Sequence, residues 1–160
     1  MIQVQIEDPR WRHIAPNPAG AARDAAALAI GAAGVPVDMA CVLLLTDDKT
    51  VRDLSRRFRG RDLATNVLAF PAPVGAAGVL GDIALAFGVC EREARDQGKG
   101  LIDHLRHLVI HGVLHLVGHD HQTPDEAARM EAIEIELLGR LGVPDPYFDR
   151  SGEEHLAQSR

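Results

Sequence analysis

The spacing of apolar residues along the chain predicts four strands. Residues 2–6 alternate between apolar and polar side chains as Ile-Gln-Val-Gln-Ile, the period of two expected of a strand with one buried face. Three later segments, at 37–45, 65–70 and 80–87, are rich in apolar and β-branched residues and are bounded by turn-forming residues. We expect these four strands to form one small sheet.

Helical periodicity and helix-capping residues predict five helices. They are expected at 19–33, from the Thr-Asp-Asp sequence at 46–48 to residue 58, at 90–97, at 101–117, and from Thr123 to Leu141. The second half of the 101–117 segment is apolar nearly all round, which is typical of a buried helix. The order of elements predicts an α+β fold, in which helices surround a small mixed four-stranded sheet and the 101–117 helix is central.

Length and composition are those of one globular domain. The 160 residues are enough to bury a core, and we assign residues 1–145 to a single catalytic domain and 146–160 to a polar C-terminal tail. Cys41 and Cys90 belong to no CxxC pair, so we expect free thiols in a reducing cytoplasm. The N-terminus has no basic leader and no apolar run is long enough to span a bilayer, so we expect no membrane partner.

One segment of the chain is basic although the whole is acidic. The net charge of −6 argues against a protein that coats nucleic acid by bulk attraction. Residues 49–62 carry six basic side chains against two acidic ones, a local charge of +4. The basic residues are Lys49, Arg52, Arg56, Arg57, Arg59 and Arg61.

Three histidines between residues 111 and 121 have the spacing of a metal site. His111 and His115 are four residues apart, so on a helix they lie on one face at about 5–6 Å, close enough to share one ion. Gly118 can adopt the left-handed conformation that ends the helix and turns His121 towards the same ion. His119 competes as the third ligand, but the ten-residue spacing from His111 to His121 favours His121.

Three imidazoles suit one Zn²⁺ ion per chain, although other divalent transition metals also accept them. Structural zinc sites usually have four protein ligands, so an open fourth position favours catalysis. Asp120 is either a carboxylate that orients an imidazole or a turn-forming aspartate. His107, one turn before His111, is either a catalytic acid, base or substrate contact or a surface histidine.

The histidine pattern differs in one position from the metzincin protease frame H-E-x-x-H-x-x-G-x-x-H, so we expect a zincin-like helix with its HxxxH ligands. Gly112 stands where the protease has the glutamate that acts as general base, which argues against peptide hydrolysis. Phosphodiester cleavage fits better, because a metal and an arginine can stabilise negative charge on phosphoryl oxygens.

Three segments, Phe58–Pro71, Leu80–Ile83 and Arg106–His121, together carry a more specific pattern. They resemble the YbeY endoribonucleases, the bacterial rRNA maturation factors, and with the order of elements the resemblance extends from about Ile2 to Leu141. It implies a metal-dependent endoribonuclease that cuts single-stranded RNA and acts in ribosomal RNA maturation and ribosome quality control. The implied partners are precursor rRNA and the small ribosomal subunit.

The resemblance assigns the metal to His111, His115 and His121 and an essential catalytic role to Arg59, whose guanidinium suits a phosphate. The remaining arginines would form a surface that follows the phosphates of a single strand: Arg52, Arg56, Arg57 and Arg61. One alternative is a metallohydrolase of peptides or small esters, which Gly112 disfavours. The other is a ribosome assembly factor with a mainly structural zinc, which the open ligand position disfavours.

Overall fold

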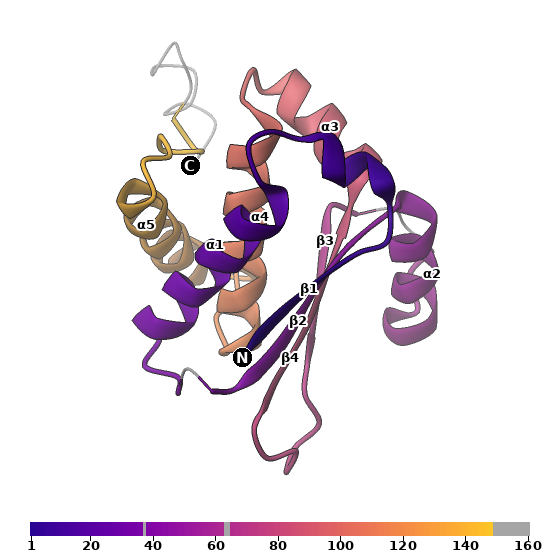
Figure 1. Ribbon diagram of the computed structural model, residues 1–160. Coiled ribbons are helices and arrows are strands. Elements are labelled where there is room, and N and C mark those ends of the chain that lie inside the picture. Colours follow the sequence, from indigo (N-terminus) through magenta and orange to yellow (C-terminus); the bar gives the residue numbers. More distant parts are fainter. Residues whose placement is uncertain (37, 63–64, 149–160) are drawn as a thin grey trace.

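A mixed sheet of four strands lies at the centre of the protein (Figure 1). The computed structural model describes residues 1–36, 38–62 and 65–148. The strands are β1 (Ile2–Ile6), β2 (Ala40–Thr46), β3 (Val67–Pro71) and β4 (Val79–Ala86), in the spatial order β1-β2-β4-β3. β1, β2 and β4 are parallel, and β3 runs antiparallel to β4. The predicted α+β class and mixed four-stranded sheet are confirmed. β2 begins later than predicted, and Val37, its predicted start, lies outside the described residues.

Within the described residues, five α-helices surround the sheet, as predicted. They are α1 (Pro18–Ala32), α2 (Asp48–Arg59), α3 (Phe87–Asp96), α4 (Leu101–Leu116) and α5 (Pro124–Arg140). α1 and α4 cover one face of the sheet and α5 packs against α4, whereas α2 lies on the opposite face (Figure 1). The sequence pattern does not predict the short 3₁₀ helix at Pro9–His13.

The main core lies between the sheet and the helices α1 and α4. Four alanines of α1 are fully buried, and their small side chains let the helix approach α4 and the sheet closely: Ala22, Ala25, Ala26 and Ala29. Leu105, Val109, Ile110 and Val113 of α4 are also fully buried. The position of α4 as the central, buried helix is therefore confirmed. A smaller apolar cluster, built on Val51, Ala84 and Ala86, lies under α2.

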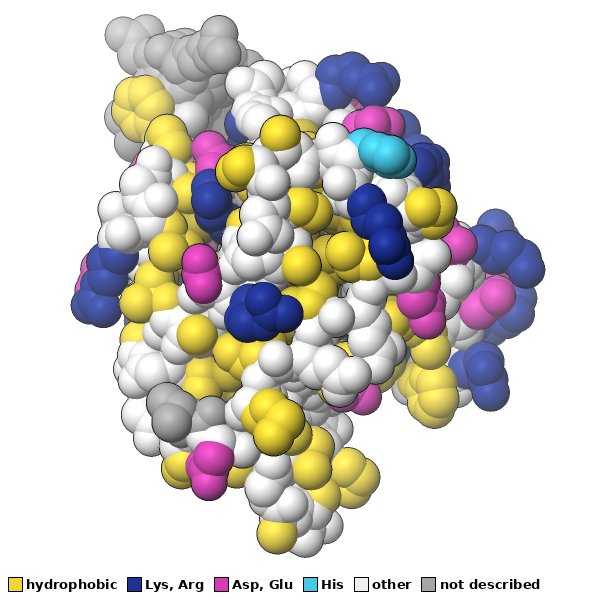
Figure 2. Space-filling model, viewed as in Figure 1, with side chains coloured by type: hydrophobic (Ala, Val, Ile, Leu, Met, Phe, Trp, Pro, Cys, Tyr) yellow, Lys and Arg dark blue, Asp and Glu magenta, His cyan; other side chains and the backbone are white. Residues whose placement is uncertain are grey.

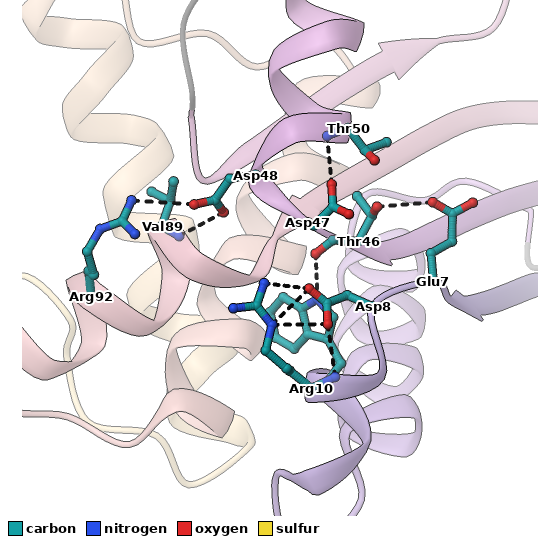
Figure 3. Close-up of polar contacts among 10 residues, drawn as sticks. Glu7, Asp8, Arg10, Thr46, Asp47, Asp48, Thr50, Val89 and Arg92 are labelled. Atoms are coloured by element: carbon teal, nitrogen blue, oxygen red, sulfur yellow. Dashed lines mark hydrogen bonds and ion pairs between the residues drawn. The ribbon is translucent and has the colours of Figure 1, made fainter.

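Side-chain caps at the end of β2 determine where two helices begin (Figure 3). Asp47 caps α2 through a hydrogen bond to the first turn of that helix. Asp48 instead accepts a hydrogen bond from the backbone N of Val89 at 3.0 Å and pairs with Arg92, so it caps α3. Because this cap comes from another element, α3 begins at Phe87 rather than at the predicted residue 90.

After α5 the chain returns towards α4. Val143 is buried, and the hydroxyl of Tyr147 reaches the carboxylate of Glu134 in α5. Residues 146–148, which we assigned to the polar tail, therefore contact the folded domain through Tyr147. The rest of that tail, 149–160, lies outside the described residues. Among the described residues, no helix has the length and apolar character needed to cross a membrane.

Candidate metal centre

Helix α4 places His111 and His115 on the same face, one turn apart. Their Nε2 atoms lie 3.2 Å apart and their ring centroids 4.7 Å apart. This is the arrangement that a spacing of four residues predicts for a helix. Both rings are partly exposed and line one cleft.

The turn after α4 brings a third histidine to this pair. The backbone N of Gly118 donates to the carbonyl of His115 and the next backbone N donates to that of Leu114, the pattern of a Schellman motif. Gly118 has a φ of 103°, in the left-handed region that glycine favours, as predicted. The chain then reverses, so that the ring centroid of His121 lies 5.4 Å from that of His111 and 5.0 Å from that of His115.

His111, His115 and His121 together form a group that can hold one ion. Each offers one ring nitrogen, and these three atoms lie within 4.8 Å of one another. His119 lines the same cleft but does not belong to the group. The structure thus brings together the three histidines that the spacing favours and leaves the competing one outside.

The chemistry of the three side chains suits a divalent transition metal. Burial lowers the pKa of His115, and the neighbouring rings of His111 and His121 lower it further. The His115 ring is therefore neutral at neutral pH and has a lone pair for a metal. The Nε2 atoms of His111 and His115 lie 3.2 Å apart, the distance of a hydrogen bond in which one ring donates and the other accepts. A shared metal ion satisfies both lone pairs.

Glu134 of α5 is a residue of this site that the sequence analysis missed. It is fully buried, and its Oε2 accepts a hydrogen bond from Nδ1 of His111 at 2.6 Å. Its Oε1 accepts a hydrogen bond from Nε2 of His107 at 2.8 Å. The signal that could have found it is an acid at a core position of an amphipathic helix, whose other buried residues are Met130, Leu137 and Leu138.

The carboxyl group of Glu134 is ionised and fully partnered. Burial acts to raise its pKa, but hydrogen bonds from His107 and His111 outweigh burial and lower the pKa to about 2. The hydroxyl of Tyr147 donates to the same Oε1 atom. Burial, and next the charge of Glu134, raise the pKa of Tyr147, so the phenol stays protonated. Three donors compensate the cost of burying this charge.

His107 lies outside the cleft that contains the three histidines. Its ring is buried, and its Nε2 atom faces Glu134 at 2.8 Å and the hydroxyl of Tyr147 at 3.2 Å. The burial of this ring excludes a surface histidine, and the catalytic role that the sequence left open for His107 stays a prediction. The physical reason for the burial is the packing of α5, which covers this part of α4.

Asp120 holds the turn that carries His121. Its Oδ1 atom accepts a hydrogen bond from the backbone N of His121 at 2.7 Å. This contact is with the backbone and not with an imidazole ring, so the geometry favours the turn-forming role among the two that the sequence left open. The carboxylate that contacts an imidazole ring of this group is that of Glu134, which accepts the hydrogen bond of His111.

Arg59 lines the cleft that contains the three histidines. It is the last residue of α2, and Gly60 follows it with a φ of 67°. Its guanidinium donates a hydrogen bond to the carbonyl oxygen of Ala69 in β3, and its Cζ atom lies 5.7 Å from the centroid of the Phe70 ring. Arg61 lines the same cleft. The three histidines, Arg59 and Arg61 therefore line one cleft.

The other three arginines lie on the exposed surface of α2, where basic side chains gather on the right of Figure 2. Arg52 pairs with Asp62 at 2.7 Å, and Arg56 pairs with Asp53 at 3.0 Å. Arg57 lies 5.7 Å from the centroid of the exposed Phe58 ring. The structure therefore divides the predicted arginine set into two residues at the cleft and three outside it.

Gly112 occupies a close contact between α4 and the sheet. A Cβ atom at this position would lie 3.0 Å from both Cδ1 and Cγ2 of Ile83 in β4. Such contacts are tighter than packed side chains normally make, so a larger residue requires Ile83 to shift. The absence of the protease glutamate thus accompanies close packing of this helix on its sheet.

Comparisons with known proteins agree with these features. Residues 7–142 match the family model described as Endoribonuclease YbeY. The Endoribonuclease YbeY of Paramagnetospirillum magneticum is 48% identical over 160 residues, which cover 93% of this chain and 96% of the relative. The Endoribonuclease YbeY of Maricaulis maris is 59% identical over 105 residues, which cover 66% of each chain. The solution structure of TM1509 from Thermotoga maritima matches 89% of this chain and 92% of its own, with a TM-score of 0.58 and 22% identity, which shows a shared fold.

Proposed function

Because the chain belongs to the family of YbeY endoribonucleases, we propose that it is a metal-dependent endoribonuclease, a hydrolase that cleaves phosphodiester bonds within RNA. The observation that carries this proposal is a single cleft lined by the three clustered histidines and by Arg59. Phosphodiester cleavage concentrates negative charge on the phosphoryl oxygens, and a metal site beside a guanidinium group suits that charge.

His111, His115 and His121 hold the metal in this proposal, and we assign one Zn²⁺ ion per chain. Three nitrogen ligands with an open fourth position are typical of catalytic zinc. When bound, the ion supplies Lewis acidity at the phosphoryl oxygen and lowers the pKa of a coordinated water. Asp120 acts by holding the turn that presents His121, as its hydrogen bond to the backbone of that residue supports.

Arg59 holds the phosphate of the scissile nucleotide. Its hydrogen bond to Ala69 attaches the guanidinium to β3 at the rim of the cleft, which reduces the number of conformations that it loses when a phosphate binds. Arg61 contacts a neighbouring phosphate from the same rim. Arg52, Arg56 and Arg57 extend this binding surface along the exposed face of α2.

The proposed substrate is single-stranded RNA, and the proposed targets are precursor rRNA and the small ribosomal subunit in the cytoplasm. A flexible strand can follow basic residues that are spread along a helix and a cleft rim, which supports a single strand over a rigid duplex. The resemblance of the histidine and arginine segments to the family supports a role in ribosomal RNA maturation and ribosome quality control.

Peptide hydrolysis is disfavoured by the surroundings of α4. The position of the protease general base is Gly112, where contact with Ile83 leaves little space for a side chain. Within the described part of the cleft the acidic lining residue is Asp120, which is hydrogen-bonded to the turn. This carboxylate holds the turn that carries His121, and it does not occupy the helical position of the protease base.

Elemental analysis of the purified protein, joined to an RNA cleavage assay, tests the proposal. We expect about one zinc ion per chain and internal cleavage of a single-stranded RNA that stops when a chelator removes the metal and returns when Zn²⁺ is added. Chelator-sensitive digestion of a peptide library without RNA cleavage would overturn the proposal in favour of a metallohydrolase of peptides.

A further inference from the structure

Glu134 connects the candidate metal site to two residues that do not touch the metal cleft. Its Oε2 atom receives the hydrogen bond of His111, while its Oε1 atom receives those of His107 and Tyr147. Neither His107 nor Tyr147 lines the cleft that contains the three histidines. We call these three residues, His107, Glu134 and Tyr147, the Glu134 cluster.

The contact between Glu134 and His111 selects one tautomer of that histidine. A carboxylate can only accept, so Nδ1 of His111 carries the proton and Nε2 carries the lone pair. The same Nε2 atom lies 3.2 Å from Nε2 of His115. The hydrogen bond therefore turns towards the proposed ion the nitrogen that has a free lone pair, and it holds the ring in that orientation.

Tyr147 makes the C-terminal segment part of this arrangement. Buried Val143 anchors the segment, and its backbone N donates to the carbonyl of Leu138 at 2.9 Å. The backbone N of Tyr147 donates to Oδ1 of Asp145 at 2.8 Å, which forms a tight turn before the phenol. The hydroxyl then donates to Glu134. Residues 143–147 thus approach the candidate metal centre from behind His111.

We propose that Glu134 is a positioning residue for the metal centre, which sets the tautomer and orientation of His111, and that Tyr147 makes the C-terminal segment a part of that centre. The inference rests on the proposed metal site. His107 and Tyr147 act through Glu134 by restricting the carboxylate to the orientation that faces His111. Carboxylates behind metal-binding histidines typically change metal affinity by about 10–100-fold when they are mutated.

Two variants and one control test the proposal. Glu134→Gln keeps the shape of the side chain but replaces an acceptor oxygen by a donor, and Tyr147→Phe removes only the hydroxyl. Glu136→Gln is the matched control, since Glu136 lies on the same helix but is exposed and pairs with Arg140. The first measurement is the dissociation constant for Zn²⁺, obtained by competition with a chromogenic chelator. The second is the nitrogen NMR spectrum of the imidazoles in the metal-free protein.

We expect Glu134→Gln to weaken Zn²⁺ binding by about 10–100-fold and Tyr147→Phe to weaken it by a smaller factor, while Glu136→Gln has no effect. In the metal-free wild-type protein at mildly alkaline pH, the His111 ring should be protonated on Nδ1, whereas in Glu134→Gln its two tautomers should exchange. A role limited to folding does not predict this spectroscopic change.

Unchanged Zn²⁺ affinity in a folded Glu134→Gln protein would overturn the inference alone. If Glu134→Gln does not fold, Tyr147→Phe decides, and wild-type affinity together with an unchanged His111 spectrum would overturn the part played by Tyr147. A wild-type protein that binds no Zn²⁺ would instead overturn the proposed metal site, a result that the same titration detects first.

Discussion

The two sides of the cleft are stabilised by different kinds of contact. On the histidine side, fully buried Glu134 joins His107, His111 and Tyr147 through hydrogen bonds. On the arginine side, the ion pairs of α2 are open to solvent, with side chains 54% and 51% exposed in the pair between Arg52 and Asp62. The histidine side is organised by hydrogen bonds to a buried carboxylate, and the arginine side by contacts that water and salt can replace.

This difference assigns different tasks to the two sides. A buried network keeps its geometry before any ligand arrives, so little reorganisation opposes metal binding. Exposed ion pairs contribute little to stability and exchange their partners at low cost. The proposed RNA contact therefore requires only that a phosphate replace Asp62 or Asp53 on the surface of α2, whereas the partners of Glu134 are buried with it.

The largest expected effect comes from removing one ligand of the histidine side. We expect His115→Ala to lose both the bound metal and RNA cleavage, because two imidazoles with an open site hold Zn²⁺ much more weakly than three. Metal content per chain and a cleavage gel give the result. His119→Ala is the control, since His119 lines the cleft outside the ligand group. Full cleavage by a metal-free His115→Ala protein would contradict the proposal.

The next effect separates the arginine side from the metal. We expect Arg59→Glu to keep the metal but to lose cleavage by at least about 100-fold, the usual cost of removing one group that stabilises charge in a transition state. Arg57→Glu makes the same charge change on the same helix outside the cleft, and it should mainly weaken binding. Equal losses of the rate at saturating RNA in both variants would show that only overall charge matters.

A smaller effect tests burial on the histidine side away from the proposed ligands. Burial lowers the pKa of His104 below its ordinary value of 6.5, although a hydrogen bond with Glu93 acts to raise it. The charges of Lys99 and His107 also lower this pKa, by smaller amounts than burial does. As the pH falls below about 6.5, the unfolded chain takes up the His104 proton before the folded one does, so stability decreases.

We therefore expect His104→Gln to lose less of its unfolding free energy than the wild type does between mildly alkaline and mildly acidic pH. Urea unfolding of the metal-free proteins at the two pH values measures this difference. The same exchange at exposed His13 serves as the control. Parallel pH dependences for the wild type and His104→Gln would show that burial of His104 does not contribute.

The smallest effects are expected on the exposed face of α2. Arg52→Gln should weaken RNA binding. Asp62→Asn should strengthen RNA binding, because it frees Arg52 from its ion-pair partner. Each change in affinity should be less than about fivefold, because surface charges are screened. Both variants should unfold at the same urea concentration as the wild type. RNA affinity measured at several salt concentrations tests this, and changes in the same direction would exclude a phosphate contact by Arg52.

Much of the fold and the three clustered histidines could be predicted from sequence because local geometry determines them. A spacing of four residues on a helix places His111 and His115 on one face in any protein. Gly118, with its φ of 103°, ends α4 by a turn that depends on neighbouring backbone groups. The strands and helices follow in the same way from apolar periodicity, since each pattern lies within one element.

Only the tertiary structure decided which distant side chains complete the site. Glu134 lies 23 residues from His111 and 27 from His107 in the chain, and Tyr147 lies 13 residues beyond Glu134. Their contacts exist because α5 packs against α4 and the segment after α5 turns back. The early start of α3 has a similar origin, because its cap is Asp48 of another helix.

The sequence by itself determined the order of the elements, the central place of α4 and the histidine motif, all of which depend on interactions between residues close in the chain. The tertiary structure places His107 in a buried position beside Glu134 and divides the arginines between the cleft rim and the exposed face of α2. The physical reason is that burial, and with it the strength of a charge or a hydrogen bond, depends on how separate elements pack.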